Sequence, residues 1–218
     1  MKRQLLCTSL AIAGLAVSAT ASAVTADAFY AAPDLAMAIP DDDAVGVSST
    51  ISISDSFTIG KIAVVVVAEH TWVGDLIFTL TGPDGTTITL ANQPGTTDPD
   101  ADAGDNANLS TDHPIIFGDL SPMSAEMLGA GPCGNNTDAV IGLDCPRWVN
   151  PDESLGGTWI GTDAMGDWTL TVSDNTGLDI GTLDGWLIAF NYQAVPVPPA
   201  IWLFASGLFA LVARRRRQ

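Results

Sequence analysis

The chain has 218 residues, and its 8 lysines and arginines against 25 aspartates and glutamates give a formal net charge of −17. Six of the basic residues lie near the two ends, so the span 24–194 keeps only Lys61 and Arg147 against all the acidic residues. Such a surface repels nucleic acid and anionic lipid, which excludes nucleic-acid binding. It also favours bound divalent cations, because few basic partners exist; a solvated acidic surface suited to a saline habitat is the alternative.

The N-terminal segment predicts a signal peptide over residues 1–23. Lys2 and Arg3 precede an apolar run over residues 5–17, and Ala21-Ser22-Ala23 is typical of a small-residue cleavage site. We expect cleavage after Ala23, with an uncleaved membrane anchor as the alternative. Cys7 precedes the end of the apolar run, which argues against a lipoprotein signal.

Strand patterns fill the span from Gly46 to Leu90, after an alanine-rich leader predicted over residues 24–37. The stretch "VSSTISIS" alternates apolar and polar residues, which predicts a strand with one buried face. The stretch "IGKIAVVVVAEH" is apolar on both faces, which is typical of a central strand. The stretch "DLIFTLTGPDGTTITLA" predicts a hairpin that turns at Pro83-Asp84-Gly85.

Residues 92–112 predict a long loop, and a less regular region follows it. This region contains Cys133 and Cys145, the only cysteines besides Cys7. In an oxidising envelope compartment we expect a disulfide between them, which would stabilise the fold by about 3 kcal/mol. A two-cysteine metal site is disfavoured, because neither histidine is near in sequence.

The stretch "DWTLTVSDNTGLDIGTLDGWLIAF", residues 167–190, predicts two strands joined as a hairpin. Trp168, Leu170 and Val172 alternate before the corner Ser173-Asp174-Asn175, and Trp186 is expected to anchor the last strand in the core. No helical periodicity of useful length occurs between the two ends of the chain. The predicted fold class is therefore all-β, an antiparallel sandwich or jelly roll.

The C-terminal stretch "VPVPPAIWLFASGLFALVARRRRQ" predicts a membrane anchor. We expect a linker over residues 192–199, a transmembrane helix core over 200–213 and a basic cytoplasmic tail over 214–218. A buried terminal helix of a soluble domain is the alternative. It would have to bury Trp202, Phe204 and Phe209 beside four exposed arginines.

This tail resembles the PEP-CTERM sorting signal of Gram-negative bacteria, in its "VPLPA"-like variants. The resemblance covers residues 195–218 and implies an inner-membrane anchor that an exosortase cuts near the proline motif. It also implies release to the cell surface or to an exopolysaccharide matrix. Val197 replaces the usual glutamate between the prolines, which leaves the cleaving enzyme open.

Four stretches of the chain together resemble the P domain, or P/Homo B domain, of kexin- and furin-type subtilisin-like proteases. They are "IPDDDAVGVSSTISIS", "HTWVGDLIFTLTGPDGTTITL", "GDN" at 104–106 and "GDWTLTVSDNTGLDIGTLDGWLIAFN". The resemblance covers residues 38–191 and implies an eight-stranded jelly-roll sandwich. Residues 123–151 depart from it, because they are longer than the family pattern and carry the cysteine pair.

The sequence favours a protein without catalytic residues. A nucleophilic hydroxyl needs a base within hydrogen-bond reach, and only His70 and His113 can serve as one. No Gly-x-Ser-x-Gly motif occurs, and the spacing suggests no partner for Ser173. A hydrolase with an unrecognised site remains the alternative.

Carboxylate and amide oxygens at the predicted strand ends favour a calcium site. The stretch "DPDADAGDNAN", residues 98–108, is rich in such hard donors, but it is not an EF-hand because position twelve is Leu109. A site assembled from several loops is expected instead, and a solvated loop with Asx turns is the alternative. The candidate ligands are Asp75, Asp105, Asn106, Asp174 and Asn175.

Together these features predict an exported, envelope-anchored, non-catalytic module with a binding or structural role. Its expected partners are an exosortase, the membrane and, on the outside, exopolysaccharide. The alternative is an accessory module that serves a subtilisin-like serine endopeptidase in trans, since that is the enzyme the P domain accompanies.

Overall fold

The computed structural model describes residues 21–25, 28–95, 106–128, 139–191 and 193–197, and it falls into two units. In the first unit, β1 (Ala21–Thr25) pairs with β12 (Gln193–Val197) in a two-stranded sheet. The predicted transmembrane core and nearly all of the predicted signal peptide lie outside the described residues. Within the described part, no helix has the length and apolar character needed to cross a membrane.

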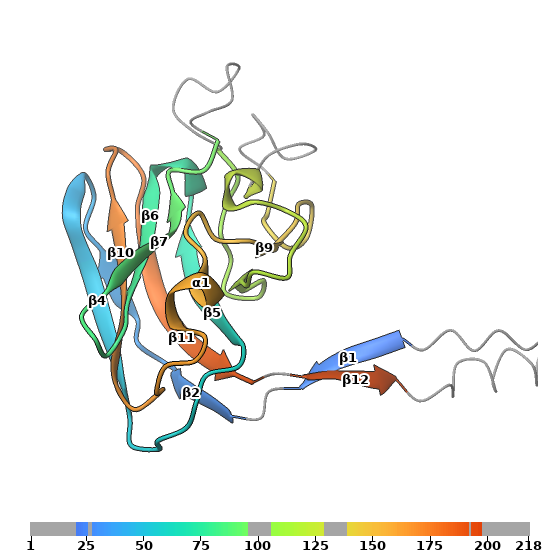
Figure 1. The fold of residues 1–218 in the computed structure, drawn as a ribbon. Coiled ribbons are helices and arrows are strands. Elements are labelled where there is room, and N and C mark those ends of the chain that lie inside the picture. Colours follow the sequence, from blue (N-terminus) through green and yellow to red (C-terminus); the bar gives the residue numbers. More distant parts are fainter. Residues whose placement is uncertain (1–20, 26–27, 96–105, 129–138, 192, 198–218) are drawn as a thin grey trace, which may run out of the picture. The chain divides into compact units, whose positions relative to one another are not determined.

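The second unit, residues 26–193, contains two sheets (Figure 1). One sheet has the order β4 (Asp43–Ile53), β10 (Gly166–Asp174), β6 (Leu76–Thr81), β7 (Thr87–Asn92), with all neighbours antiparallel. The other has the order β2 (Ala28–Ala32), β11 (Gly181–Phe190), β5 (Ile62–His70), β8 (Ile115–Phe117), β9 (Trp148–Val149). β3 (Met37–Ile39) also pairs with β11, and only β8 and β9 run parallel. The helical elements are short: η1 (Val73–Asp75), η2 (Ala125–Met127) and α1 (Leu155–Trp159).

The four-stranded sheet shows the predicted alternation. Trp168, Leu170 and Val172 of β10 are fully buried, and Thr169 and Thr171 between them point outward. The hydroxyls of these threonines pair with hydroxyls on β4, Thr171 with Ser48 and Thr169 with Thr50, each at 2.8 Å. The outer face of this sheet is therefore a ladder of hydroxyl groups, which hydrogen-bond across strands and face water.

The second sheet is centred on β5, as its two-sided apolar pattern predicts. β5 lies between β11 and β8, with Val66 opposite Trp186 and Val65 opposite Leu187. Val66 is completely buried, whereas Val65 is only half-buried on the outer face. Both faces of this strand are apolar, but among the described residues only one face is fully buried.

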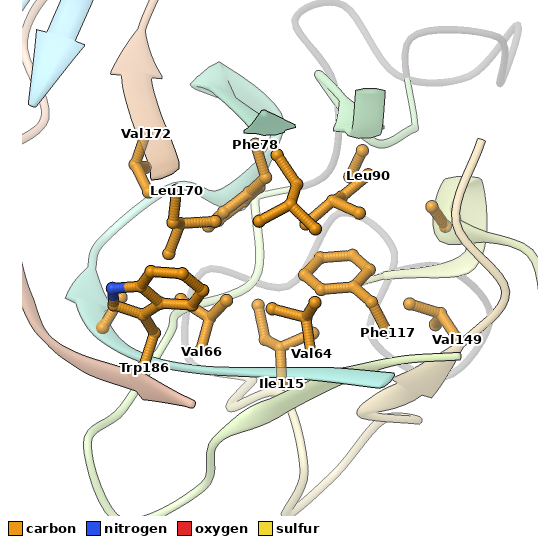
Figure 2. Packing of buried hydrophobic residues seen from close by; sticks show 14 of the residues in the cluster. Val64, Val66, Phe78, Leu90, Ile115, Phe117, Val149, Leu170, Val172 and Trp186 are labelled. Atoms are coloured by element: carbon orange, nitrogen blue, oxygen red, sulfur yellow. The ribbon is translucent and has the colours of Figure 1, made fainter. Parts of the chain in front are cut away.

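The core lies between the two sheets. Figure 2 shows Leu170, Val172 and Phe78 on one side of the core, facing Trp186 and Val66 on the other. Every buried hydrophobic residue of this cluster lies within residues 39–190. The second unit thus contains a complete core of its own, which is the condition for a domain to fold alone.

Two features differ from the sequence predictions. The strands within residues 167–190 do not form a hairpin, because β10 and β11 belong to different sheets and the link between them crosses the sandwich. Both strands show the same alternation that a hairpin would, so the pattern could not reveal the crossing. The predicted leader also contains β2, which pairs with β11 along residues 28–32. The all-β prediction itself is confirmed.

Candidate functional site

Three polar side chains are buried together where β5 and β10 end. His70 is the last residue of β5, Asp75 the last of η1, and Asp174 the last of β10. Their exposed fractions are 1%, 2% and 0%. Because β5 and β10 belong to opposite sheets, this polar cluster closes one end of the sandwich. We call it the buried corner.

The buried corner is organised by the imidazole of His70. The main-chain N–H of Trp72 donates to Nδ1 of His70 at 3.1 Å, and Nε2 lies 3.1 Å from Oδ2 of Asp174. Since Nδ1 accepts, the ring proton is on Nε2 and is donated to the Asp174 carboxylate. Both ring nitrogens are thus engaged, and the histidine links the two sheets through a hydrogen bond that no water reaches.

Asp75 carries the strongest electrostatic perturbation of the corner. Burial, followed by the neighbouring charge of Asp174, raises the pKa of its carboxyl from 3.8 to about 7. A hydrogen bond from the Thr176 side chain opposes this shift, whereas Asp179 and Asp41 add to it. The main-chain carbonyl of Asp75 accepts the N–H of Asn175 at 2.9 Å, so η1 is fastened to the end of β10.

Ser173 and Asn175 flank Asp174 and bond to each other rather than to the histidine. Nδ2 of Asn175 donates to Oγ of Ser173 at 3.0 Å, and Ser173 is 6% exposed. His113 lies in the turn after residue 110, next to Gly142, and is only partly buried. Within the described residues, neither histidine hydrogen-bonds to a serine or threonine hydroxyl.

Two glycines permit the close backbone approach at this corner. Gly46 of β4 has φ +64°, and a Cβ there would overlap the Val172 carbonyl, next to the register shift between Val172 and Asp174. A Cβ on Gly181 of β11 would overlap the Glu69 carbonyl and press on the His70 ring. Any side chain at either position would displace the strand end that carries His70 or Asp174.

Of the four predicted ligands that the structure describes, Asn106 is the one with an unsatisfied buried atom. It is 8% exposed, and its Oδ1 has no hydrogen-bond partner. The next residue, Ala107, accepts the N–H of Val73 at 3.0 Å, which holds this segment beside η1. A buried orphan acceptor is unusual in native proteins and is satisfied when a cation or water binds.

The structure therefore brings Asp75, Asp174 and Asn175 together, and joins the segment of Asn106 to η1. Asp105, the fifth predicted ligand, lies outside the described residues. Among the residues described, no group of three or more His, Cys, Asp or Glu side chains forms a metal-binding set. Cys133 also lies outside them, so its pairing with the buried Cys145 stays a prediction.

The sequence interpretation missed the structural role of His70. It considered this residue only as a base, although its position at the end of a nine-residue apolar strand was a signal of burial. A polar side chain there needs a buried partner, and that partner comes from β10, 104 residues away.

Comparison with known proteins gives one family match. Residues 59–114 match the model of the proprotein convertase P-domain. This range contains His70, Asp75 and Asn106, and it runs from before β5 to the start of β8. No curated protein matches the chain.

Among solved structures, a serine protease of Aeromonas sobria is 18% identical with a TM-score of 0.43, and the alignment covers 78% of this chain and 27% of that one. The complex of the Aeromonas sobria serine protease with its chaperone gives the same identity and TM-score, with 81% and 28% covered. These values are too low to establish a shared fold. The chain spans little more than a quarter of the length of either protease.

The raised pKa of Asp75 predicts a pH-dependent stability for residues 26–193. Between pH 3.8 and about 7 the folded state keeps a proton that the unfolded chain has lost, so the contribution of Asp75 to stability is full below pH 3.8 and is lost as pH rises toward 7. Asp75→Asn removes this loss. In urea unfolding with chelator present, the stability of the variant relative to the wild type should rise across this window and then level off.

The matched control is Asp167→Asn, which changes an exposed carboxylate on β10. Its stability difference from the wild type should lack the rise with pH that Asp75→Asn shows. A difference for Asp75→Asn that stays constant from pH 4 to pH 7 would show that the carboxyl is not perturbed by burial.

Proposed function

We propose that residues 38–191 form a P domain with the jelly-roll strand order, and that it acts as a non-catalytic binding or structural module. The match of residues 59–114 to the P-domain model carries this proposal, because it spans β5, β6 and β7 and includes two residues of the buried corner. The four resembling stretches extend the assignment toward both ends of the domain.

The chemistry of the buried corner supports a non-catalytic role. A general base needs a free nitrogen that faces a nucleophile, and both nitrogens of His70 are engaged. The Ser173 hydroxyl instead accepts from Asn175. Each polar group thus has a structural partner, and the corner holds the two sheets together.

Hydrolysis assays and envelope pull-downs test this role together. Purified residues 26–193 should show no peptidase or esterase activity above that of the Ser173→Ala and His70→Ala variants. Pull-down from native envelopes should recover either polysaccharide or no partner, and it should not enrich a protease. Activity that disappears in either variant, while circular dichroism shows an intact fold, would overturn the non-catalytic assignment.

The second candidate function is an accessory role for a subtilisin-like serine endopeptidase that acts in trans. It is favoured by the family match, since proprotein convertases are the proteases that give the matching model its name. The same pull-down separates the two candidates, because stoichiometric recovery of a subtilase favours the accessory role. In neither case does the chain need an active site of its own.

We also propose that the module is exported and held at the inner membrane of a Gram-negative envelope. The support is the sequence of the two ends: the signal-peptide pattern of residues 1–23, the uncharged run 200–213 and the arginines that follow. The resemblance of residues 195–218 to a sorting tail adds an exosortase as partner and the cell surface or exopolysaccharide as destination.

Cell fractionation tests this localisation. The full chain should sediment with membranes, or appear outside the cell in a shortened form if the tail is cut. A chain ending at residue 194 should be soluble in the periplasm. Recovery of the full chain in the cytoplasm, with its N-terminal residues intact, would contradict export.

We further propose that the loops at the buried corner bind calcium. Two observations support this proposal. The buried carboxyl of Asp75 lies near the charge of Asp174, which makes ionisation of Asp75 unfavourable, and Oδ1 of Asn106 has no hydrogen-bond partner. A bound cation would supply positive charge where the described residues around these carboxylates offer no lysine or arginine. Asn175 and Asp105 complete the set predicted from sequence.

Thermal unfolding of residues 26–193 tests the calcium proposal. Millimolar Ca²⁺ should raise the melting temperature relative to chelator, because a ligand bound only by the native state stabilises it. The increase should be lost in Asp75→Asn and retained in Asp167→Asn. Identical melting temperatures with calcium and with chelator would end the proposal.

A further inference from the structure

The two sheets present chemically different outer faces. On the four-stranded sheet the outer face is a ladder of hydroxyls, whereas on the other sheet it is apolar. Strand register aligns Ala31, Leu187, Val65 and Ile116 in one row across β2, β11, β5 and β8. Each of these side chains is only partly buried or exposed, so among the described residues of the second unit none fully covers this apolar strip.

A groove of about 410 Å³ opens on this face, next to the strip. The groove forms where the regular hydrogen bonding between strands is interrupted at two places. Asp184 is the extra residue of a register shift in β11, and residues 33–36 loop out between β2 and β3. The N–H of Leu35 bonds to the carbonyl of Asp184 at 2.8 Å, which fixes the loop over the bulge. Such bulges re-aim side chains beside binding sites.

The wall and one end of the groove differ in character. Ala31, Val65, Val67 and Leu187 supply apolar surface, and Val67 lies opposite Gly185, where a Cβ would meet the Ala32 carbonyl at 3.1 Å. Asp34 and Asp184 border the same hollow, and the Thr182 hydroxyl donates to the Asp184 carboxylate at 2.7 Å. No lysine or arginine lines the groove among the described residues.

We propose that this groove binds an extended segment of a partner polypeptide that carries an arginine or lysine flanked by apolar side chains. The cation would pair with Asp34 and Asp184 while its neighbours cover Val65 and Val67. A second copy of this chain is a poor occupant, because its span 24–194 offers only Lys61 and Arg147 against 25 acidic residues. The inference rests on the proposed binding role and names the partner's chemistry.

Fluorescence anisotropy with a labelled nine-residue peptide of alternating leucine and arginine tests the proposal. Residues 26–193 should bind it at physiological ionic strength. Replacing its arginines by citrulline, or its leucines by serine, should each weaken binding at least about tenfold, since charge and apolar contact both contribute. The Asp34→Asn/Asp184→Asn double variant and the Val67→Ser variant should show losses of the same order.

Matched controls exclude nonspecific attraction to an acidic protein. Asp84→Asn/Asp167→Asn removes two carboxylates near the other sheet, and Val45→Ser changes a 79% exposed valine of β4. Both should bind the arginine peptide as the wild type does, with melting temperatures of all variants compared. Equal losses in the controls, or no binding at millimolar protein, would overturn the proposal.

Sedimentation velocity tests whether a second copy of this chain occupies the groove instead. A concentration-dependent dimer that Val67→Ser abolishes would assign the apolar strip to a second copy and reject the peptide site. These results are independent of the hydrolysis assays. If the protein is inactive and fails to bind the peptide, the proposal of a non-catalytic module stands and only the proposal of a peptide-binding groove is rejected.

Discussion

The hydrogen bond between His70 and Asp174 is the contact on which the end of the sandwich depends. It joins the last residue of β5 to the last residue of β10, and these strands belong to opposite sheets. Both side chains are fully buried, so neither can exchange its partner for water. Removing one side chain would leave the other as an unpaired buried polar group. The free-energy penalty of such a group is larger than the net stabilisation from one hydrogen bond.

The same contact explains why a group of residues that resembles catalytic chemistry has a structural role. The histidine meets a carboxylate that follows directly after a serine in the chain, yet the imidazole bonds only to the carboxylate and a main-chain N–H. The serine hydroxyl bonds to Asn175 instead. The proposed binding role therefore rests on the outer surfaces of the two sheets.

Those surfaces are unequal for a reason that lies in the strands. β10 and β4 place serine and threonine between their buried residues, whereas β5 places alanine and valine there. The row that includes Val65 and Leu187 keeps partial exposure among the described residues of the second unit. The acidic end of the adjacent groove favours a positively charged partner on that face.

The sequence by itself determined the strands β4 to β7, β10 and β11, the central position of β5 and the turn at residues 83–85, because these depend on local alternation and turn chemistry. It also placed Asp75 and Asp174 at strand ends. Only the tertiary structure decided that β10 and β11 lie in different sheets, that residues 28–32 form an edge strand, and that His70 meets Asp174. Alternation fixes which face of a strand is buried, but it carries no information about which distant strand lies across the core.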